Sequence, residues 1–164
     1  MKKLFLDYEK YTETRDFKTE CSYFYHLGND GLASLIEMAA FACVCRQCEE
    51  APCVKACPKE ALEKQEGGIV KRHNMRCIGC KSCVIACPFG TIYTEAVNHI
   101  ASKCDLCVER CNGSSPLCVR TASAKGVLEY AEIEADEEKH NFAVGKNLIV
   151  HAVPWKKVLK EKKK

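Results

Sequence analysis

The stretch Cys77-Ile78-Gly79-Cys80-Lys81-Ser82-Cys83-Val84-Ile85-Ala86-Cys87-Pro88 places four cysteines at a compact spacing and ends on a proline. An earlier stretch, from Cys45 to Pro58, carries four cysteines in the same order and closes on the same Cys-Pro pair. It differs from the later stretch only by two extra residues before its third cysteine. The two stretches therefore form an internal repeat.

The composition limits what the cysteines can do. The chain has 164 residues, which is enough for one compact domain or two very small ones. Its net charge of +3, with 29% of residues charged, is ordinary and does not indicate nucleic-acid binding. Fourteen cysteines are therefore the dominant feature of the chain.

The expected compartment decides how these cysteines are interpreted. The sequence has no run of about 18 apolar residues, and Met1–Asp7 shows neither a secretory nor a twin-arginine signal. We therefore expect a cytoplasmic protein, unless a partner subunit carries an export signal for both. Because cytosolic thiols are kept reduced, the cysteines are better explained as metal ligands than as disulfides.

The spacing of the cysteines distinguishes between possible metals. The stretch from Cys77 to Pro88 matches the C-x2-C-x2-C-x3-C-P run of bacterial ferredoxins at every fixed position. Three closely spaced thiolates fold around one side of a cubane, whereas structural zinc sites pair two knuckles across a longer gap. The pattern therefore predicts two 4Fe-4S clusters rather than zinc.

The assignment of ligands follows from an exchange between the two runs. In two-cluster ferredoxins, the cysteine before the proline binds the cluster of the other run. The first predicted cluster is therefore held by Cys45, Cys48, Cys53 and Cys87. The second is held by Cys57, Cys77, Cys80 and Cys83.

Regular secondary structure is expected to be short and separated by many loops. Residues 29–42 predict a helix with Leu32, Leu35 and Ile36 on one face, capped at Asn29 or Asp30. Each cysteine run is expected to include a short helical turn between its third and fourth ligands. Hairpin and strand patterns are found in three further places: Ala61–Val70 around a Gly-Gly turn, Ile92-Tyr93 with Ile100-Ala101, and Leu148-Ile149-Val150.

The C-terminal part of the chain has a different character. Glu132–Lys139 is acidic and Trp155–Lys164 is basic. A solvated tail is the favoured interpretation. The alternative is an arm that lies on a partner subunit and is anchored by Trp155.

A third group of cysteines follows the two runs. It comprises Lys103-Cys104-Asp105-Leu106-Cys107 and Pro116-Leu117-Cys118-Val119. Together with the two runs, these motifs resemble the small iron–sulfur subunits of dimethyl sulfoxide reductase, respiratory formate dehydrogenases and formate hydrogenlyase, over about residues 3–130. Members of that family carry four cysteine runs and four clusters.

The resemblance implies an α+β fold of two ferredoxin-like units, with the inner unit inserted in the outer one. The middle runs form the inner unit, and the first and last runs wrap around it. The implied boundaries are 1–40 and 104–131 for the outer unit, 41–103 for the inner two-cluster unit, and 132–164 for a C-terminal extension that is a candidate for partner binding.

Both outer runs depart from the family pattern. By the exchange rule, one outer cluster would use the positions of Tyr11, Thr14, Phe17 and Ala122, none of which is cysteine. Ser123 also replaces the proline that follows the last family cysteine. We expect this cluster to be absent and the rings of Tyr11 and Phe17 to help fill its volume.

The ligand set of the other outer cluster is complete. A third 4Fe-4S cluster is therefore expected at Cys21, Cys104, Cys107 and Cys118. Taken alone, Cys21 would be read as a buried apolar thiol. Cys111 competes with Cys118 as a ligand, although the resemblance favours Cys118, so Cys111 and Cys43 are left free.

Clusters with complete cysteine ligation move single electrons and have no open iron site for a substrate. The sequence shows no catalytic nucleophile–base pair and no nucleotide fingerprint. The function expected first is thus an electron-transfer subunit that connects a catalytic subunit to an external carrier such as a ferredoxin or another redox subunit.

The resemblance implies a molybdenum or tungsten enzyme, a hydrogenase or a carbon monoxide dehydrogenase as partner. A tungsten enzyme of the aldehyde:ferredoxin oxidoreductase type, including the benzoyl-CoA reductase relatives, is favoured by analogy. The alternative is a free polyferredoxin shuttle, which the positive charge and lysine-rich end disfavour because shuttles are commonly acidic. A maturation or regulatory protein that senses oxygen is a third possibility, which no sequence feature supports.

Overall fold

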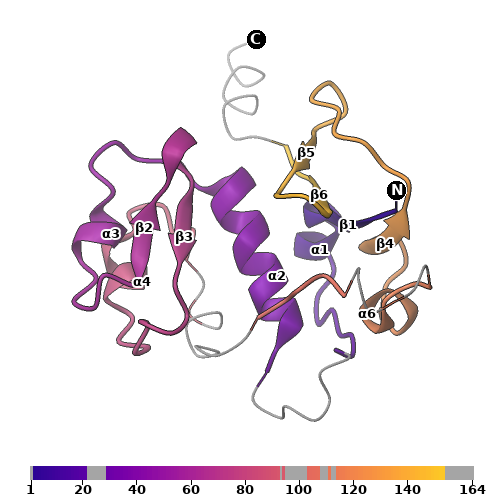
Figure 1. Ribbon diagram of the computed structural model, residues 1–164, viewed down its shortest axis with the longest axis horizontal. Helices are drawn as coiled ribbons and strands as arrows, with labels where there is room; N and C mark the ends of the chain where they lie inside the picture. The colour runs from indigo at the N-terminus through magenta and orange to yellow at the C-terminus, as the bar shows by residue number, and fades with distance from the viewer. Residues whose placement is uncertain are drawn as a thin grey trace. The chain divides into compact units, whose positions relative to one another are not determined.

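A computed structural model describes residues 2–21, 29–92, 94, 103–107, 111 and 114–153. The fold is mixed α+β, with short strands and helices joined by loops (Figure 1). The chain divides into two compact units. Unit 1 comprises residues 1–27 and 104–164, and unit 2 comprises residues 28–103. None of the helices in the described residues is long and apolar enough to cross a membrane.

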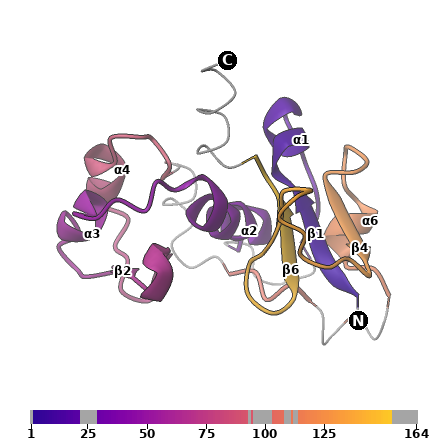
Figure 2. The same cartoon turned by 90° about the horizontal axis from the view of Figure 1, so that it is seen from above.

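Unit 1 is built on a four-stranded sheet in the order β4-β1-β6-β5 (Figures 1 and 2). The strands are β1 (Lys3–Asp7), β4 (Leu128–Ala131), β5 (Asn141–Ala143) and β6 (Leu148–His151). β1 pairs antiparallel with β4 and parallel with β6, so the N-terminal strand occupies the interior of the sheet. Leu4, Leu6 and Ile149 are at most 1% exposed and form part of its core.

The sheet corrects the expectation of a solvated tail. Residues 141–151 contribute β5 and β6 rather than free chain, and these strands pair with each other and with β1. The apolar run Leu148-Ile149-Val150, which predicted a strand, is fully buried in β6 and explains why this part of the chain folds back. Trp155 and the basic end lie outside the described residues.

A short helix, α1 (Tyr8–Glu13), follows β1 directly. The Asp7 side chain caps it by accepting a hydrogen bond from the Lys10 backbone N–H at 3.0 Å. A second short helix in this unit, α6 (Leu117–Arg120), begins after Pro116. Cys118 lies within α6, and the segment that follows α1 leads to Cys21.

Unit 2 begins with the predicted helix, which the structure confirms as α2 (Gly31–Ala39). Asp30 caps it, since its side chain accepts a hydrogen bond from the Ala33 N–H at 2.9 Å. Leu35 and Ile36 are buried, whereas Leu32 is half-buried. The helix continues as a π-helical turn, Ala40–Val44, which leads the chain directly into Cys45.

The rest of unit 2 follows the repeat. The Gly-Gly hairpin is confirmed as β2 (Leu62–Lys64) paired antiparallel with β3 (Val70–Arg72). The helical turns inside the cysteine runs are confirmed as α3 (Pro52–Lys55) and α4 (Ser82–Ala86). The predicted strand pair of Ile92-Tyr93 with Ile100-Ala101 lies outside the described residues except for Ile92.

The core of unit 2 lies between the two cysteine runs. Its buried members come from all of these elements: Phe41, Cys53, Leu62, Val70, Cys83 and Ile92. Two of the predicted cluster ligands are thus part of the apolar core. Because this core is small, the cysteine environments and the packing of unit 2 depend on each other.

Candidate metal centres

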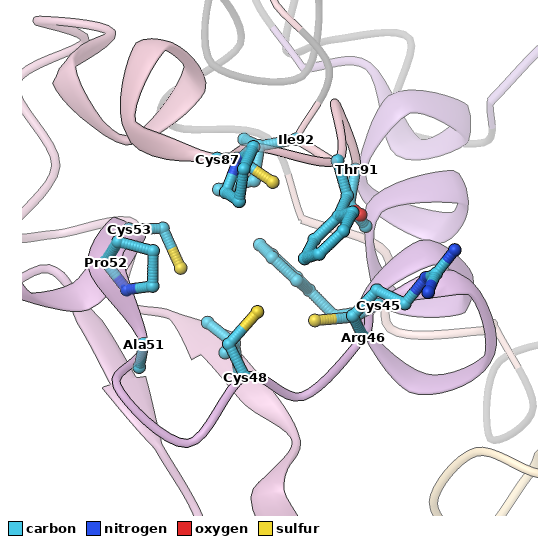
Figure 3. A pocket seen from close by; sticks show the side chains of 13 residues that line it. Cys45, Arg46, Cys48, Ala51, Pro52, Cys53, Cys87, Thr91 and Ile92 are labelled. Carbon is cyan, nitrogen blue, oxygen red and sulfur yellow. The ribbon is translucent and has the colours of Figure 1, made fainter.

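Four cysteines line one pocket in unit 2, and we call this pocket site one. They are Cys45, Cys48, Cys53 and Cys87. Figure 3 shows their sulfur atoms pointing into a shared space between the loop after α2 and the end of α4. The first run supplies three of the cysteines, and the second run supplies Cys87, as the exchange between runs requires.

A second pocket in unit 2, site two, is lined by the reciprocal set. Its cysteines are Cys57, Cys77, Cys80 and Cys83. Here the second run supplies three cysteines and the first run supplies Cys57. Among the described residues, no His, Cys, Asp or Glu side chains gather as a single metal ion requires. The four thiols of each pocket instead surround a volume, which suits a multi-iron cluster better than one ion.

The loops that carry these cysteines share an unusual backbone conformation. The residue before the second cysteine of each run has a positive φ: 52° at Gln47, 69° at Gly79 and 64° at Leu106. Ala51 and Lys81, which lie two residues before the third cysteine, also have positive φ. Such conformations cost on the order of 1–3 kcal/mol in non-glycine residues and cluster at functional sites. The third cysteine group therefore shares the left-handed conformation before its second cysteine, although Cys107 itself also has a positive φ of 52°, unlike Cys48 and Cys80.

Hydrogen bonds reach several of the sulfur atoms. Gln47 N–H donates to Cys45 Sγ at 3.4 Å, and Ala61 N–H donates to Cys57 Sγ at 3.2 Å. In site two, the Ser82 hydroxyl is hydrogen bonded to Cys80 Sγ at 3.4 Å, and this contact lowers the pKa of Cys80. Hydrogen bonds to cluster sulfurs tune reduction potentials, so these donors bear on redox chemistry.

Burial opposes ionisation of several thiols in unit 2. It raises the pKa of Cys45, Cys53 and Cys83. Burial also acts on Cys87, but hydrogen bonds from the backbone and the hydroxyl of Thr91 outweigh it and lower the pKa of that thiol. Binding of iron requires thiolates, so an iron cluster held by these cysteines would displace their protons.

Unit 1 brings together the four cysteines of the expected third cluster, which we call site three. Burial raises the pKa of Cys104 to about 12, with smaller contributions from the charges of Cys118, Cys107 and Cys21. The pKa of Cys118 is raised to about 11, mainly by burial and further by Cys107 and Cys21. The four sulfurs therefore lie close enough to influence one another's ionisation.

Side-chain hydrogen bonds hold the segment that ends at Cys21 beside the segment of Cys118. The Thr19 hydroxyl donates to the Cys118 carbonyl at 2.6 Å, and Glu20 N–H donates to the Thr121 hydroxyl at 3.0 Å. Lys18 and Ser123 exchange two further hydrogen bonds, each at 2.9 Å. The two segments are almost a hundred residues apart in sequence, so this pairing positions Cys21 for site three.

The positions where cysteine is replaced also lie along these segments. The rings of Tyr11 and Phe17 pack edge to face, with centroids 5.9 Å apart. Tyr11 also contacts Tyr8 at 6.1 Å. Ala122 lies between Thr121 and Ser123, the two residues that pair with the segment after Phe17. The aromatic cluster of Tyr8, Tyr11 and Phe17 therefore lies on the segment where the family resemblance places cysteine ligands.

The two remaining cysteines differ in their surroundings. Cys43 lies in the π-helical turn, and burial raises its pKa to about 11. Cys111 N–H donates to the Cys107 carbonyl at 3.0 Å, so its backbone belongs to the site-three loop. Cys111 therefore stays an alternative to Cys118 as a ligand.

A protein family whose description fits this arrangement matches a segment of the chain that contains most of the cysteines. Residues 36–130 match the family described as "4Fe-4S dicluster domain". The chain belongs to this family. The resemblance to iron–sulfur electron-transfer proteins that the motifs predicted is thereby confirmed, and 4Fe-4S clusters are its cofactors.

Curated relatives share the same region. YsaA of Escherichia coli K12, named as an electron transport protein, is 43% identical over 57% of this chain and 58% of its own length. The thiosulfate reductase electron transfer subunit PhsB of Salmonella typhi is 39% identical over 57% and 49%, respectively. YnfG of E. coli K12, named as an anaerobic dimethyl sulfoxide reductase chain, is 37% identical over 58% and 47%. The chain thus spans about half the length of these relatives.

Sequence reasoning did not identify the groups that surround the cysteines. Arg72 lines site two, and the Thr91 hydroxyl is hydrogen bonded to the sulfur of Cys87 in site one. The sequence carries one signal for Arg72: it is a charged residue at a position of a short strand that faces the interior. Thr91 could have been found by comparing the repeats, since Ala61 occupies its position after the first Cys-Pro pair.

Proposed function

We propose that this chain is the electron-transfer subunit of an oxidoreductase complex and carries three 4Fe-4S clusters. The observation that carries the proposal is the grouping of twelve cysteines into three sets of four, with the ligands of sites one and two lining separate pockets. Each of these two sets draws three cysteines from one run and one from the other, which supports the exchange of ligands.

Site three is supported by two independent features. Leu106 repeats the left-handed conformation of Gln47 and Gly79 at the residue before the second cysteine. Hydrogen bonds between residues 18–20 and 118–123 bring Cys21 to the same place. A buried thiol without a role would need neither feature.

The nested arrangement of two ferredoxin-like units belongs to the same proposal. We propose an inner unit at residues 41–103 and an outer unit at residues 1–40 and 104–131. The division of the chain into residues 28–103 and the remainder supports this arrangement. The outer unit would then be the remnant of a two-cluster ferredoxin that kept one ligand set. The 132–164 extension would complete its sheet through β5 and β6.

The chemistry supplied by such clusters is one-electron transfer without an open coordination position. The residues of the chain hold the sulfurs at fixed spacing, exclude water through the core of unit 2 and donate hydrogen bonds to individual thiolates. None of these roles binds a substrate. Electrons must therefore come from one partner and leave to another.

The partner we propose is a larger catalytic subunit of the molybdenum or tungsten class. The names of PhsB and YnfG assign those relatives to thiosulfate and dimethyl sulfoxide reductases, which supports a catalytic partner of this general kind. The tungsten preference rests on analogy alone. The cytoplasmic location expected from the sequence is part of this proposal.

Anaerobic purification from the native source, followed by metal analysis of whatever stays bound, tests the proposal. We expect a larger subunit and molybdenum or tungsten to co-purify with the iron. Nickel in its place would redirect the assignment to a hydrogenase or a carbon monoxide dehydrogenase. A chain that emerges alone, with iron and no second metal, would contradict the subunit role and favour the free-shuttle alternative.

A further inference from the structure

Arg72 occupies a position where a strand normally places an apolar side chain. In β3, Val70 and Arg72 face the interior while Lys71 faces solvent, and Arg72 pairs across the hairpin with buried Leu62. The Arg72 side chain is only 2% exposed. A buried charge is costly unless it is paired, so its presence in so small a core calls for a specific role.

The charge of Arg72 is paired with Glu37 of α2. Nε donates to Glu37 Oε1 at 2.5 Å and Nη2 donates to Oε2 at 2.9 Å. The pair is bidentate, and the Glu37 side chain is 11% exposed. Such geometry fixes the plane of the guanidinium and therefore the direction in which its remaining donors point.

The guanidinium also reaches site two. Arg72 lines the same pocket as Cys57, Cys77, Cys80 and Cys83. Its side chain is hydrogen bonded to Cys77 and interacts with the charge of that thiol. A cation at this depth is poorly screened by solvent, so its effect on a nearby change of charge is larger than that of a surface residue.

Site one has no equivalent buried ion pair in the described residues. The cation that lines it is Arg46, which is half-buried and stacks on the Phe89 ring with its guanidinium carbon 4.8 Å from the ring centroid. Solvent screens a side chain in that position more strongly. The pair of Arg72 and Glu37 is therefore a feature of site two.

We infer that Arg72 and Glu37 set the reduction potential of the cluster at site two. The inference rests on the proposed function. Reduction adds one electron, delivered by a redox partner or an electrode, and one unit of negative charge, while no bond forms or breaks. Arg72 favours that added charge through its hydrogen bond to Cys77. Glu37 holds the guanidinium in place and partly neutralises it, which limits the effect.

Two variants that act in opposite directions test this inference. Arg72→Met/Glu37→Leu replaces the buried pair by apolar side chains, a change that proteins often tolerate without loss of stability. It should shift the midpoint potential of site two to a more negative value. Glu37→Gln keeps the cation and removes its counter-charge, so it should shift the same potential to a more positive value.

The size and the assignment of the shift can be measured by redox titration of the anaerobically purified full chain with EPR detection. We expect each variant to change the reduction equilibrium about tenfold, which is about 59 mV for one electron. The signal of site two is the one that Cys80→Ala removes. The matched control is Glu50→Gln/Lys55→Gln, which removes an exposed ion pair in the first run and should leave the site-two potential unchanged.

The outcomes separate this inference from the proposed function. Unchanged site-two potentials in variants with full iron content would overturn the inference and leave the proposed function standing. Loss of site-two iron from both variants would also overturn it, because the pair would then be needed to build the site. A parent chain that binds no iron at site two would overturn the proposed function and the inference together.

Discussion

At the residue scale, the proposed third cluster depends on Cys21. It is the only cysteine before α2, and hydrogen bonds from Thr19 and Glu20 hold its segment beside Cys118. A ligand role requires all four thiols of site three, so loss of any one should empty that site. The count of iron atoms therefore depends on one side chain in a way that can be measured.

We predict that Cys21→Ala lowers the iron content by up to one cubane, about four irons per chain. The measurement is iron analysis of the anaerobically purified variant together with its EPR spectrum. Cys111→Ala is the matched control and should retain the parental iron content. Full iron in Cys21→Ala, or a loss in Cys111→Ala, would contradict the assignment of ligands to site three.

Thr91 carries a second prediction at this scale. Thr91 is 6% exposed and its side chain is hydrogen bonded to the sulfur of Cys87, whereas Ala61 at the equivalent position of the repeat has no hydroxyl. Thr91→Val removes this hydroxyl and keeps the shape. We expect the reduction potential of site one to become more negative by less than about 59 mV. This shift corresponds to a change of less than about tenfold in the reduction equilibrium.

Redox titration with EPR detection checks this change, and Ser82→Ala serves as the comparison. The Ser82 hydroxyl contacts Cys80 in site two, so its removal should shift the other cluster instead. If both variants shifted the reduction potential of the same cluster, the two hydroxyls would not act on separate sites.

The sequence alone named the two sets of cysteines that line separate pockets, but not the residues around them. Cysteine spacing alone separated the ligands of site one from those of site two, because the pattern is local and repeated. Arg72 and Glu37 could not be paired in this way, since they are 35 residues apart and belong to different elements. Their contact depends on how α2 packs against the hairpin, which no local pattern encodes.

At the scale of elements, the conformation of the cysteine loops is the most informative feature. Leu106 has a φ of 64°, a region that β-branched side chains enter only with strong steric conflict. Glycine adopts it without conflict. The loop from Cys104 to Cys107 is therefore sensitive to the shape of this residue even though Leu106 is not a ligand.

We predict that Leu106→Ile lowers the iron content of site three, whereas Leu106→Gly keeps it. Both variants remove the leucine, so the contrast isolates the backbone requirement from the loss of the side chain. Iron analysis and EPR measure the outcome. Equal loading of the two variants would show that the left-handed conformation is not needed for this site.

Elements were predictable where a local signal exists. Asn29 and Asp30 were the two candidate caps of α2, and Asp30 is the one that caps it. Gly67 and Gly68, with φ of 81° and 85°, marked the hairpin turn. The π-helical turn from Ala40 to Val44 carried no such signal. It is a departure from the regular helix at the point where the chain must deliver Cys45 to its pocket.

At the scale of the whole molecule, the first and last strands of the structure lie side by side. β1 pairs in parallel with β6 through Leu4–Asp7 and Leu148–His151. A pairing between segments so far apart in sequence cannot be read from local patterns. The sequence correctly placed a strand at Leu148-Ile149-Val150, but it gave no means of finding the partner of that strand.

This sheet provides a prediction about how the clusters are distributed. Ile149 is fully buried in β6, so Ile149→Ala should lower the stability of unit 1 by about 2–5 kcal/mol. Because site three belongs to unit 1 and sites one and two belong to unit 2, the variant should release the iron of site three at a lower temperature than the parent chain. The iron of the other two sites should be released at the parental temperature.

Visible absorption and released iron, followed during anaerobic heating, measure this separation. Lys71→Ala, an exposed change in unit 2, is the control and should alter neither step. Simultaneous release of all iron at the lower temperature in Ile149→Ala would show that the two units do not hold their clusters independently.

The central claim is that twelve cysteines hold three 4Fe-4S clusters. The most direct test is the content of iron and acid-labile sulfide per chain in the anaerobically purified protein. The account predicts about twelve of each. A value of about eight, with EPR signals of only two clusters, would contradict it and leave Cys21, Cys104, Cys107 and Cys118 without the role proposed for them.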